Sequence, residues 1–288
     1  MHTDERGYLQ LVSVFIRVYP RLIYMRQYIS QKNLDSDGLL TIIGKDYRYL
    51  HNVLRLVSGD MIHVRLPSGE LQPMTVCLVD EKAKKITLQV CDIAEGERIG
   101  ENQPEETGSI ESTEFILFMA VPKSSKFDLI VRQATECGIA KIIPVQTEFS
   151  QAGGEKMNFR GERFERIIRE ARQQSGSPVN TRIENCATLE EACEIWKKST
   201  ENIPEKEKLA VVLYERNDST VSIKQACENK RNLKKLALFC GSEGGICPEE
   251  VSVLCEAGFT TVHLKTNILR CETAALYGIA ALQVEVSG

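Results

Sequence analysis

The stretch KKLALFCGSEGGICPEE, residues 234–250, decides the fold class of this chain. It opens on the apolar run LALFC, which is typical of a strand buried on both faces. This strand passes into a turn at residues 241–245, in which three of the five residues are glycine. Pro248 and the two glutamates after it are typical of the first turn of a helix. A buried strand, a glycine-rich turn at its carboxyl end and a helix form the repeating unit of an α/β sheet, and ligands bind such sheets at that end.

The rest of the C-terminal half repeats this alternation. We expect strands at residues 115–121, 141–145, 208–215, 234–240 and 260–264, and helices at 126–138, 158–175, 188–199, 248–258 and 271–286. Gly138 is placed to end one helix, and Thr188 with Glu191 forms the capping box of another. The pattern predicts a mostly parallel sheet covered by helices on both faces.

The N-terminal part has a different pattern. Residues 25–95 contain short β-branched runs separated by turn signals, with one helix expected over 46–57 and Asp46 as its N-cap, so we predict a small β-barrel. Residues 96–114 are acidic and nearly free of large apolar side chains, which is typical of a linker. We hypothesise that residues 1–24 are an extension outside the folded unit, arising from an upstream start codon.

Composition narrows the class of protein. Of the 288 residues, 42% are hydrophobic and 26% charged, so the chain can bury a full core and is neither disordered nor a small disulfide scaffold. No apolar run reaches the roughly 18–20 residues that cross a bilayer, so we expect a cytoplasmic protein without membrane contact. The ten cysteines include no CxxC pair and the four histidines no ligand-like pair, so we expect reduced thiols and no metal.

Charge and motifs restrict the ligands. The net charge of −4 excludes nucleic-acid binding through bulk charge, so RNA can be held only by a local patch. Arginines recur at every third position from 160 to 172, but glutamates interleave them, and a solvated, ion-paired face is favoured over a phosphate track. The absence of GxGxxG or GxxxxGK[ST] after a strand disfavours a dinucleotide-dependent dehydrogenase and the usual phosphate-binding loops.

Three predicted strand ends carry candidate ligand-binding residues. The first is Gly241–Gly245, for which a flexible strand–helix turn is the alternative. The second is KTNILRCETA, residues 265–274, before a helix whose small residues (Ala274, Ala275, Gly278, Ala280 and Ala281) permit close backbone approach or, alternatively, tight core packing. The third is Tyr214-Glu215-Arg216, which alone favours a solvated charge pair.

Several segments together resemble a known family. GSEGG followed by PEE, and LKTNILRCETAAL at residues 264–276, resemble the C-terminal signature of SPOUT methyltransferases, and within them the 16S rRNA (uracil-N3)-methyltransferase family. HNVLRLVSGD (51–60), PKSSKFDLIVRQATECGIAKIIPV (122–145) and REARQQSGS (169–177) are similar to further segments of that family in the same order. The resemblance implies a PUA-like RNA-binding barrel at 25–95, a SPOUT domain with a C-terminal trefoil knot at 115–288, and a homodimer.

The resemblance also implies S-adenosyl-L-methionine as cofactor. This molecule carries a sulfonium cation and no phosphate, so a site built from backbone groups at Gly241–Gly245 and Ile268–Leu269 suits it. The cofactor-binding residues that the resemblance implies are Leu213, Tyr214, Glu215, Gly241, Ser242, Glu243, Gly244, Gly245, Leu264, Lys265, Ile268, Leu269, Thr273 and Ala274.

The implied reaction is methylation of N3 of a uridine in 16S rRNA of the small ribosomal subunit. The substrate supplies the nucleophile, so no Ser/His/Asp or Cys/His arrangement is required. N3 lies on the Watson–Crick edge and carries a proton, so the base must be unpaired and that proton must leave. We hypothesise that Arg270 stabilises the negative charge developing on the uracil oxygens. Glu243 or Glu272 could remove the proton or hold Arg270 in place, and the sequence does not decide between these roles. A helix-cap role is a further alternative for Glu272.

Six basic side chains are candidates for contact with RNA phosphates. The candidate RNA-binding residues are Arg26, Arg48, Arg55, Arg65, Lys123 and Lys126. Ser242, Lys265, Asn267 and Ser177 stand where the family has Pro, Gly, Arg and Arg, which weakens the case for identical RNA contacts. Two alternatives remain at this point: a non-catalytic RNA-binding or ribosome-assembly factor of the same fold, and a SPOUT methyltransferase with another RNA target.

Overall fold

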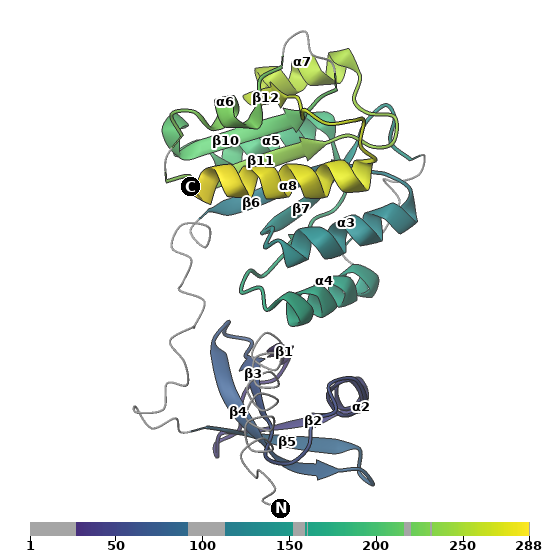
Figure 1. Ribbon diagram of the computed structural model, residues 1–288, viewed down its shortest axis with the longest axis vertical. Helices are drawn as coiled ribbons and strands as arrows, with labels where there is room; N and C mark the ends of the chain where they lie inside the picture. The colour runs from purple at the N-terminus through teal and green to yellow at the C-terminus, as the bar shows by residue number, and fades with distance from the viewer. Residues whose placement is uncertain are drawn as a thin grey trace, which may run out of the picture. The chain divides into compact units, whose positions relative to one another are not determined.

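The computed structural model describes residues 27–91, 113–151, 159, 161–215, 220–230 and 232–287. The hypothesised extension at 1–24, Arg26 and most of the acidic segment lie outside the described residues. The chain forms two compact units, the first comprising Met1–Glu101 with Gln173–Gly176 and the second Asn102–Arg172 with Ser177–Gly288 (Figure 1).

The first unit is a five-stranded curled sheet. Its strands are β1 (Gln27–Ile29), β2 (Leu39–Ile43), β3 (Met61–Arg65), β4 (Leu71–Asp80) and β5 (Lys85–Val90), in the order β1-β3-β4-β5-β2. β1 runs parallel to β3 and the other pairs are antiparallel, with a register shift between Val76 and Leu78 that bends β4. Alternate residues such as Leu40 and Ile42 point into the core, as the period of two in LLTII requires. The described pairing does not join β1 to β2, so closure into a barrel stays a prediction.

The helix of this unit is shorter than the sequence predicts. α2 (Gly44–Arg48) continues as a π-helical turn, η1 (Tyr49–Val53), and ends four residues before Val57. The chain leaves the helix because Arg55 adopts a left-handed conformation with φ 56°. Leu56 thereby turns back into the core, and the N–H of Leu56 donates to the carbonyl of Leu50. The N-cap is Ile43, not Asp46, whose carboxylate lies in the first turn and accepts a hydrogen bond of 3.0 Å from the Tyr28 hydroxyl.

The second unit is built on a fully parallel sheet of seven strands. They are β6 (Glu114–Ala120), β7 (Lys141–Gln146), β8 (Arg182–Ile183), β9 (Ala187–Thr188), β10 (Lys208–Leu213), β11 (Lys235–Cys240) and β12 (Phe259–Val262). The order is β12-β10-β11-β6-β7-β8, and β9 also pairs with β7. The predicted parallel α/β sheet is thereby confirmed.

Helices cover both faces of this sheet (Figure 1). Helices α3 (Ser124–Glu136), α4 (Glu162–Ser175), α6 (Ile223–Cys227) and α8 (Cys271–Ser287) pack on one face, and α5 (Leu189–Ser199) and α7 (Pro248–Glu256) on the other. A short 3₁₀ turn, η3 (Glu205–Glu207), precedes β10. β6 shows how sequence fills both cores: Leu117 and Met119 face α3 and α8, while Phe118 faces α5 and α7. Full burial of each such side chain contributes about 1.5–3 kcal/mol.

The predicted capping residues of three helices in this unit are confirmed, whereas α4 begins at Glu162 rather than at residue 158 and α3 begins at Ser124 rather than at residue 126. Thr188 caps α5 with Glu191 in a capping box, and Pro248 opens α7. Gly138 follows α3 with φ 75°, a left-handed conformation that favours glycine. The sequence patterns missed β8, β9 and α6, because two-residue strands and a five-residue helix are too short to show periodicity. Within the described ranges, no helix combines the length and apolar composition that crossing a membrane requires.

Candidate functional site

The parallel sheet brings four segments to one edge. Because β6, β10, β11 and β12 all run in the same direction, their carboxyl ends meet there. Residues 121–126, 214–215, 241–245 and 263–271 follow these strands directly. Three of these segments are the candidate strand ends of the sequence, and the fourth carries Lys123 and Lys126.

The glycine loop, Gly241–Gly245, is a closed and packed turn. The N–H of Gly245 donates to the carbonyl of Ser242 at 3.1 Å, and Gly245 has φ 78°. A Cβ on Gly241 would lie 2.8 Å from the carbonyl carbon of Gly245, and one on Gly244 would lie 2.6 Å from the Cβ of Phe149. Glycine is therefore required at 241 and 244 for space and favoured at 245 for conformation.

The segment after β7 supports the glycine loop and was missed by the sequence analysis. Ser242, which is buried, donates its hydroxyl to the carbonyl of Phe149 at 2.6 Å. The segment is itself folded by Ser150, whose hydroxyl lies 2.9 Å from that of Thr147 and accepts the Thr147 N–H at 3.0 Å. A Thr-x-x-Ser pattern at the carboxyl end of a buried strand is a signal that could have located it.

The end of β10 lies beside the glycine loop and the end of β12. The N–H of Tyr214 donates to Val262 at 3.0 Å, and the Tyr214 side chain is buried. The Glu215 carboxylate lies 3.6 Å from where a Cβ on Gly245 would be. The structure thus brings Tyr214 and Glu215 beside the glycine loop, while Arg216, the other member of the predicted charge pair, lies outside the described residues.

Helix α8 approaches the sheet closely through its small residues. A Cβ on Gly278 would meet Leu213 and Leu238 side chains, each at 3.0 Å, so α8 packs directly on β10 and β11. The buried Cys240 Sγ lies 3.8 Å from the carbonyl of Cys271, which joins the start of the glycine loop to the start of α8. The small residues of α8 therefore serve both purposes that the sequence offered, tight core packing and close approach of backbones.

Lys126 contacts both candidate carboxylates. Its Nζ lies 3.3 Å from Glu243 Oε1 in the glycine loop and 3.5 Å from Glu272 Oε2 in the first turn of α8. The backbone N–H of Lys123 also donates to Glu243 at 3.2 Å, and the Cys271 thiol donates to Glu272 at 3.3 Å. Three elements of the carboxyl edge therefore meet at two carboxylates.

These contacts keep both carboxyls ionised. Burial raises the pKa of Glu243, but backbone N–H groups and then Lys126 outweigh it, so this pKa lies below its usual value. Burial likewise raises the pKa of Glu272, but its own backbone N–H, the Cys271 thiol and Lys126 together outweigh this effect and lower the pKa. Burial raises the pKa of Cys271 itself to about 12, so it is a protonated donor at neutral pH.

The 264–270 loop is more open than the glycine loop. Leu264 packs against the core, whereas Lys265 and Thr273 are exposed, Leu269 and Ala274 are half-buried, and the Ile268 side chain is 91% exposed. Arg270 is exposed, and in the described parts of the chain its guanidinium has no hydrogen-bond or ion-pair partner. The structure does not pair Arg270 with either carboxylate, so its charge is available to a ligand.

The predicted RNA-binding residues differ in their surroundings. Arg48, Arg55 and Lys123 are exposed. Arg65 is not free, because its Nε donates to Gln27 and its Nη1 to the carbonyl of Gly69, both at 2.8 Å. Lys126 is the lysine bound between the two carboxylates.

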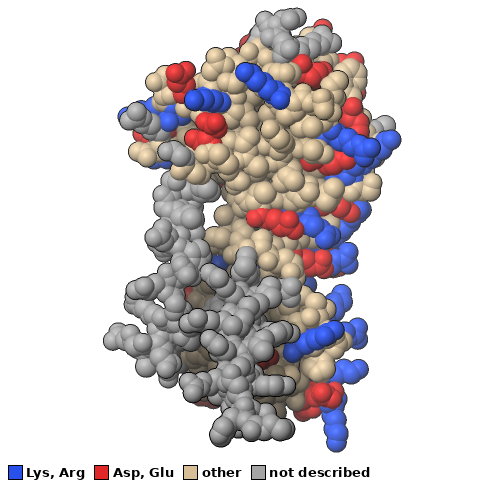
Figure 2. Space-filling model, in the orientation of Figure 1, with Lys and Arg blue, Asp and Glu red and all other residues tan. Residues whose placement is uncertain are grey.

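The arginines of the predicted stripe have different surroundings, and the first of them, Arg160, lies outside the described residues. Arg163 pairs with Asp128 and Arg166 lies 4.0 Å from Glu170, whereas Arg172 is buried and donates to Asn180. Basic and acidic side chains are interspersed on the face drawn in Figure 2. The ion-paired interpretation of this helix is supported.

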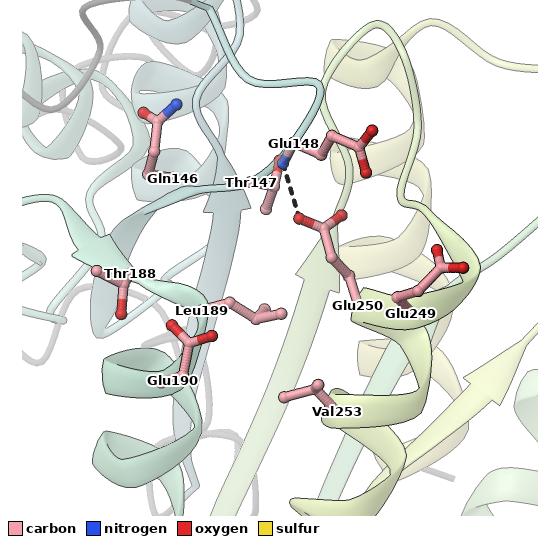
Figure 3. A pocket seen from close by; sticks show the side chains of 9 residues that line it. All are labelled: Gln146, Thr147, Glu148, Thr188, Leu189, Glu190, Glu249, Glu250 and Val253. Atoms are coloured by element: carbon pink, nitrogen blue, oxygen red, sulfur yellow. Dashed lines mark hydrogen bonds between the residues drawn. The ribbon is translucent and has the colours of Figure 1, made fainter.

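A separate cavity of about 330 Å³ lies between β7 and the starts of α5 and α7 (Figure 3). Glu148, Glu190, Glu249 and Glu250 line it, and Glu250 accepts the N–H of Glu148 at 2.7 Å. None of these is a predicted site residue. In the described portion of the chain, no group of three or more His, Cys, Asp or Glu side chains is arranged to hold a metal ion.

Comparison with known proteins identifies similar chains. Residues 110–283 match the model of a family described as an RNA methyltransferase domain. The ribosomal RNA small subunit methyltransferase E 2 of Borreliella burgdorferi is 26% identical over 259 residues, covering 89% of this chain and 96% of that protein. The ribosomal RNA small subunit methyltransferase E of Bacillus subtilis is 24% identical, covering 89% of this chain and 94% of that protein.

A solved structure shares the fold. The crystal structure of the ribosomal RNA small subunit methyltransferase E of Neisseria gonorrhoeae, bound to S-adenosyl methionine, has a TM-score of 0.68 to this chain. It is 20% identical in sequence and covers 91% of this chain and 98% of its own. Both units of the chain therefore have counterparts in one protein of similar length.

Proposed function

Since the chain belongs to the RNA methyltransferase domain family, we propose that it transfers a methyl group from S-adenosylmethionine to ribosomal RNA of the small subunit. Relatives named as small subunit rRNA methyltransferases align over nearly the whole chain, including both units. We propose the finer target as N3 of a uridine in 16S rRNA, on the resemblance of the GSEGG and LKTNILRCETAAL segments.

The observation that carries the proposal is the convergence at the carboxyl edge of the sheet. Three segments that lie apart in the sequence meet there: the glycine loop, the end of β10 and the start of α8. Gly241 and Gly244 leave no space for side chains, so the loop offers backbone N–H and C=O groups rather than side chains to a ligand. Backbone donors and acceptors, with carboxylates nearby, match a cation that has no phosphate.

The residues present fit S-adenosylmethionine. Leu213, Tyr214 and Glu215, the glycine loop, and Leu264, Lys265, Ile268, Leu269, Thr273 and Ala274 are the residues that we propose to hold it. When bound, this cofactor supplies a methyl carbon attached to a positively charged sulfur. Glu243 and Glu272 are ionised at neutral pH and favour a cation in their vicinity.

The substrate base would be held by the open side of the site. Arg270 is exposed and unpaired in the described part of the chain, so its guanidinium can donate to uracil oxygens as negative charge develops there. Glu243 and Glu272 are bound to Lys126, and a carboxylate with a lowered pKa is a weak proton acceptor. We therefore assign these two residues to holding the site together, and leave the N3 proton to solvent or RNA groups.

The remaining parts of the proposal concern architecture. We propose that residues 25–95 form a PUA-like barrel that binds RNA, with Arg48 and Arg55 exposed on it. We propose that residues 115–288 form a SPOUT domain whose C-terminal loops are knotted, that two copies assemble as a homodimer, and that the protein acts in the cytoplasm. Gly278 packed on Leu213 and Leu238 supports the close threading that a knot needs.

A methylation assay tests the function. Small ribosomal subunits from a deletion strain are incubated with the purified full chain and isotopically labelled S-adenosylmethionine, and the 16S rRNA is digested to nucleosides for mass spectrometry. We expect one labelled methyl group, on a uridine that co-elutes with 3-methyluridine. RNA binding without transfer would instead identify a non-catalytic ribosome-assembly factor, and transfer only to other RNA would identify a methyltransferase with a different target.

A further inference from the structure

Lys126 lies between two segments that are far apart in the sequence. It belongs to the first turns of α3, while Glu243 lies in the glycine loop and Glu272 in the first turn of α8. Its Nζ is within 3.5 Å of both carboxylates, and its side chain is 28% exposed. One ammonium group therefore joins the glycine loop to the first turn of α8, two segments that the proposed cofactor site uses.

The surroundings of Lys126 argue against a contact with RNA phosphate. Two carboxylates against one ammonium leave a local charge of −1, which repels a phosphate approaching the same point. The Lys123 N–H adds a further donor to Glu243, so that carboxylate is held from two sides. The Cys271 thiol does the same for Glu272, and the buried Cys240 in turn contacts the carbonyl of Cys271.

We propose that Lys126 is a positioning residue, which ties the glycine loop to the first turn of α8 and thereby sets Arg270 and Thr273 relative to Gly241–Gly245. This inference rests on the proposed function, since the reaction it assists is the proposed methyl transfer. Arg270 directly precedes α8, and its carbonyl accepts the N–H of Ala274 at 2.7 Å, so a shift of the first turn moves Arg270 with it.

The test compares Lys126→Met, which keeps length but removes charge, with Lys126→Arg, which keeps charge. Lys198→Met is the matched control, because Lys198 forms an exposed ion pair with Glu194 on α5, away from the site. For each full-length variant, calorimetry measures the Kd for S-adenosylmethionine, filter binding measures the Kd for RNA as a function of salt, and the methylation assay measures kcat and KM. Thermal melting checks that each variant is folded.

For a positioning role we expect Lys126→Met to weaken S-adenosylmethionine binding and lower kcat, each by about tenfold, as loss of partly exposed charge-assisted hydrogen bonds predicts. The salt dependence of RNA binding stays unchanged, Lys126→Arg recovers most of the loss, and Lys198→Met behaves as the wild type. A double variant with Glu243→Gln should lose little more than Lys126→Met alone.

The opposite pattern overturns the inference. If Lys126→Met leaves cofactor affinity and kcat intact but raises the Kd for RNA and flattens its salt dependence, Lys126 is a phosphate contact. If the wild-type chain neither binds the cofactor nor transfers a methyl group, the proposed function has failed. Should Lys126→Met fail to fold, Lys126→Gln and the Glu243→Gln single variant give the same comparison.

Discussion

The hydroxyl of Ser242 donates a hydrogen bond of 2.6 Å to the carbonyl oxygen of Phe149, which fastens the glycine loop to the segment after β7. The Phe149 side chain packs over Gly244 in the same contact, although Phe149 as a residue is 45% exposed. The shape of the loop therefore depends on a segment remote in sequence as well as on its own glycines.

Gly244→Ala should distort the glycine loop. The new Cβ would lie 2.6 Å from the Cβ of Phe149, so the loop or the phenylalanine must move, at a cost of about 1–3 kcal/mol in the free energy of unfolding. Affinity for S-adenosylmethionine should fall with it, as calorimetry would show. Adding Phe149→Ala should restore part of the stability, and a strictly additive double variant would contradict the proposed contact.

Arg270→Ala should remove activity without affecting the fold. Its side chain is exposed and has no partner in the described part of the chain, so the melting temperature should change little. Loss of a donor to developing negative charge typically lowers kcat by about 10²–10³-fold. Single-turnover methylation measures this, and full activity of the folded variant would rule out the proposed role.

Acid should break the ion pairs of Lys126 with Glu243 and Glu272. The pKa of each carboxyl is lowered from its usual 4.5 in the folded chain, so their contribution to stability is complete above that value and is lost as the pH falls through the lower folded pKa. Cofactor affinity should accordingly be flat above pH 4.5 and fall below it. In Lys126→Met the fall should begin at higher pH, and an unchanged profile would count against the ion pairs.

Arg55 and Arg65 should respond differently to alanine substitution. Arg55 is exposed, so Arg55→Ala should weaken RNA binding and reduce its salt slope by about one, with little change in stability. Arg65 holds Gln27 and Gly69, so Arg65→Ala should instead destabilise the first unit by about 1–3 kcal/mol. Urea denaturation and filter binding separate the two effects, and the reverse assignment would show that Arg65 serves RNA.

The second unit was largely predictable because its signals are local and strong. The apolar runs of β6 and β11, the capping box at Thr188 and Pro248 at the start of α7 each specify structure within a few residues. The helix at 46–57 was less predictable, because its apolar spacing continues to Val57 while the chain leaves the helix at Val53. Burial of Leu56 decides that end, and this depends on tertiary packing.

The candidate site was predictable only in part. Glycine density marked residues 241–245, but the roles of Phe149 and Lys126 depend on contacts across more than one element. Lys126 was predicted as an RNA contact, and its ion pairs with Glu243 and Glu272 could not be read from the sequence because those partners lie more than 100 residues away. The hydrogen bonds of Arg65 to Gln27 and Gly69 likewise depend on tertiary pairing, so the sequence could not show them, and its contact with RNA stays a prediction.

The strand order of the second unit has a consequence for how the chain matures during synthesis. β6 lies in the middle of the sheet between β7 and β11, and Phe115 pairs with Leu236. During synthesis, one hydrogen-bonding edge of β6 stays unpaired until β11 has been made, and the apolar side chains of β6 stay exposed to solvent until then. Because this pairing is late and non-local, we expect the nascent chain to fold slowly and to need protection by chaperones.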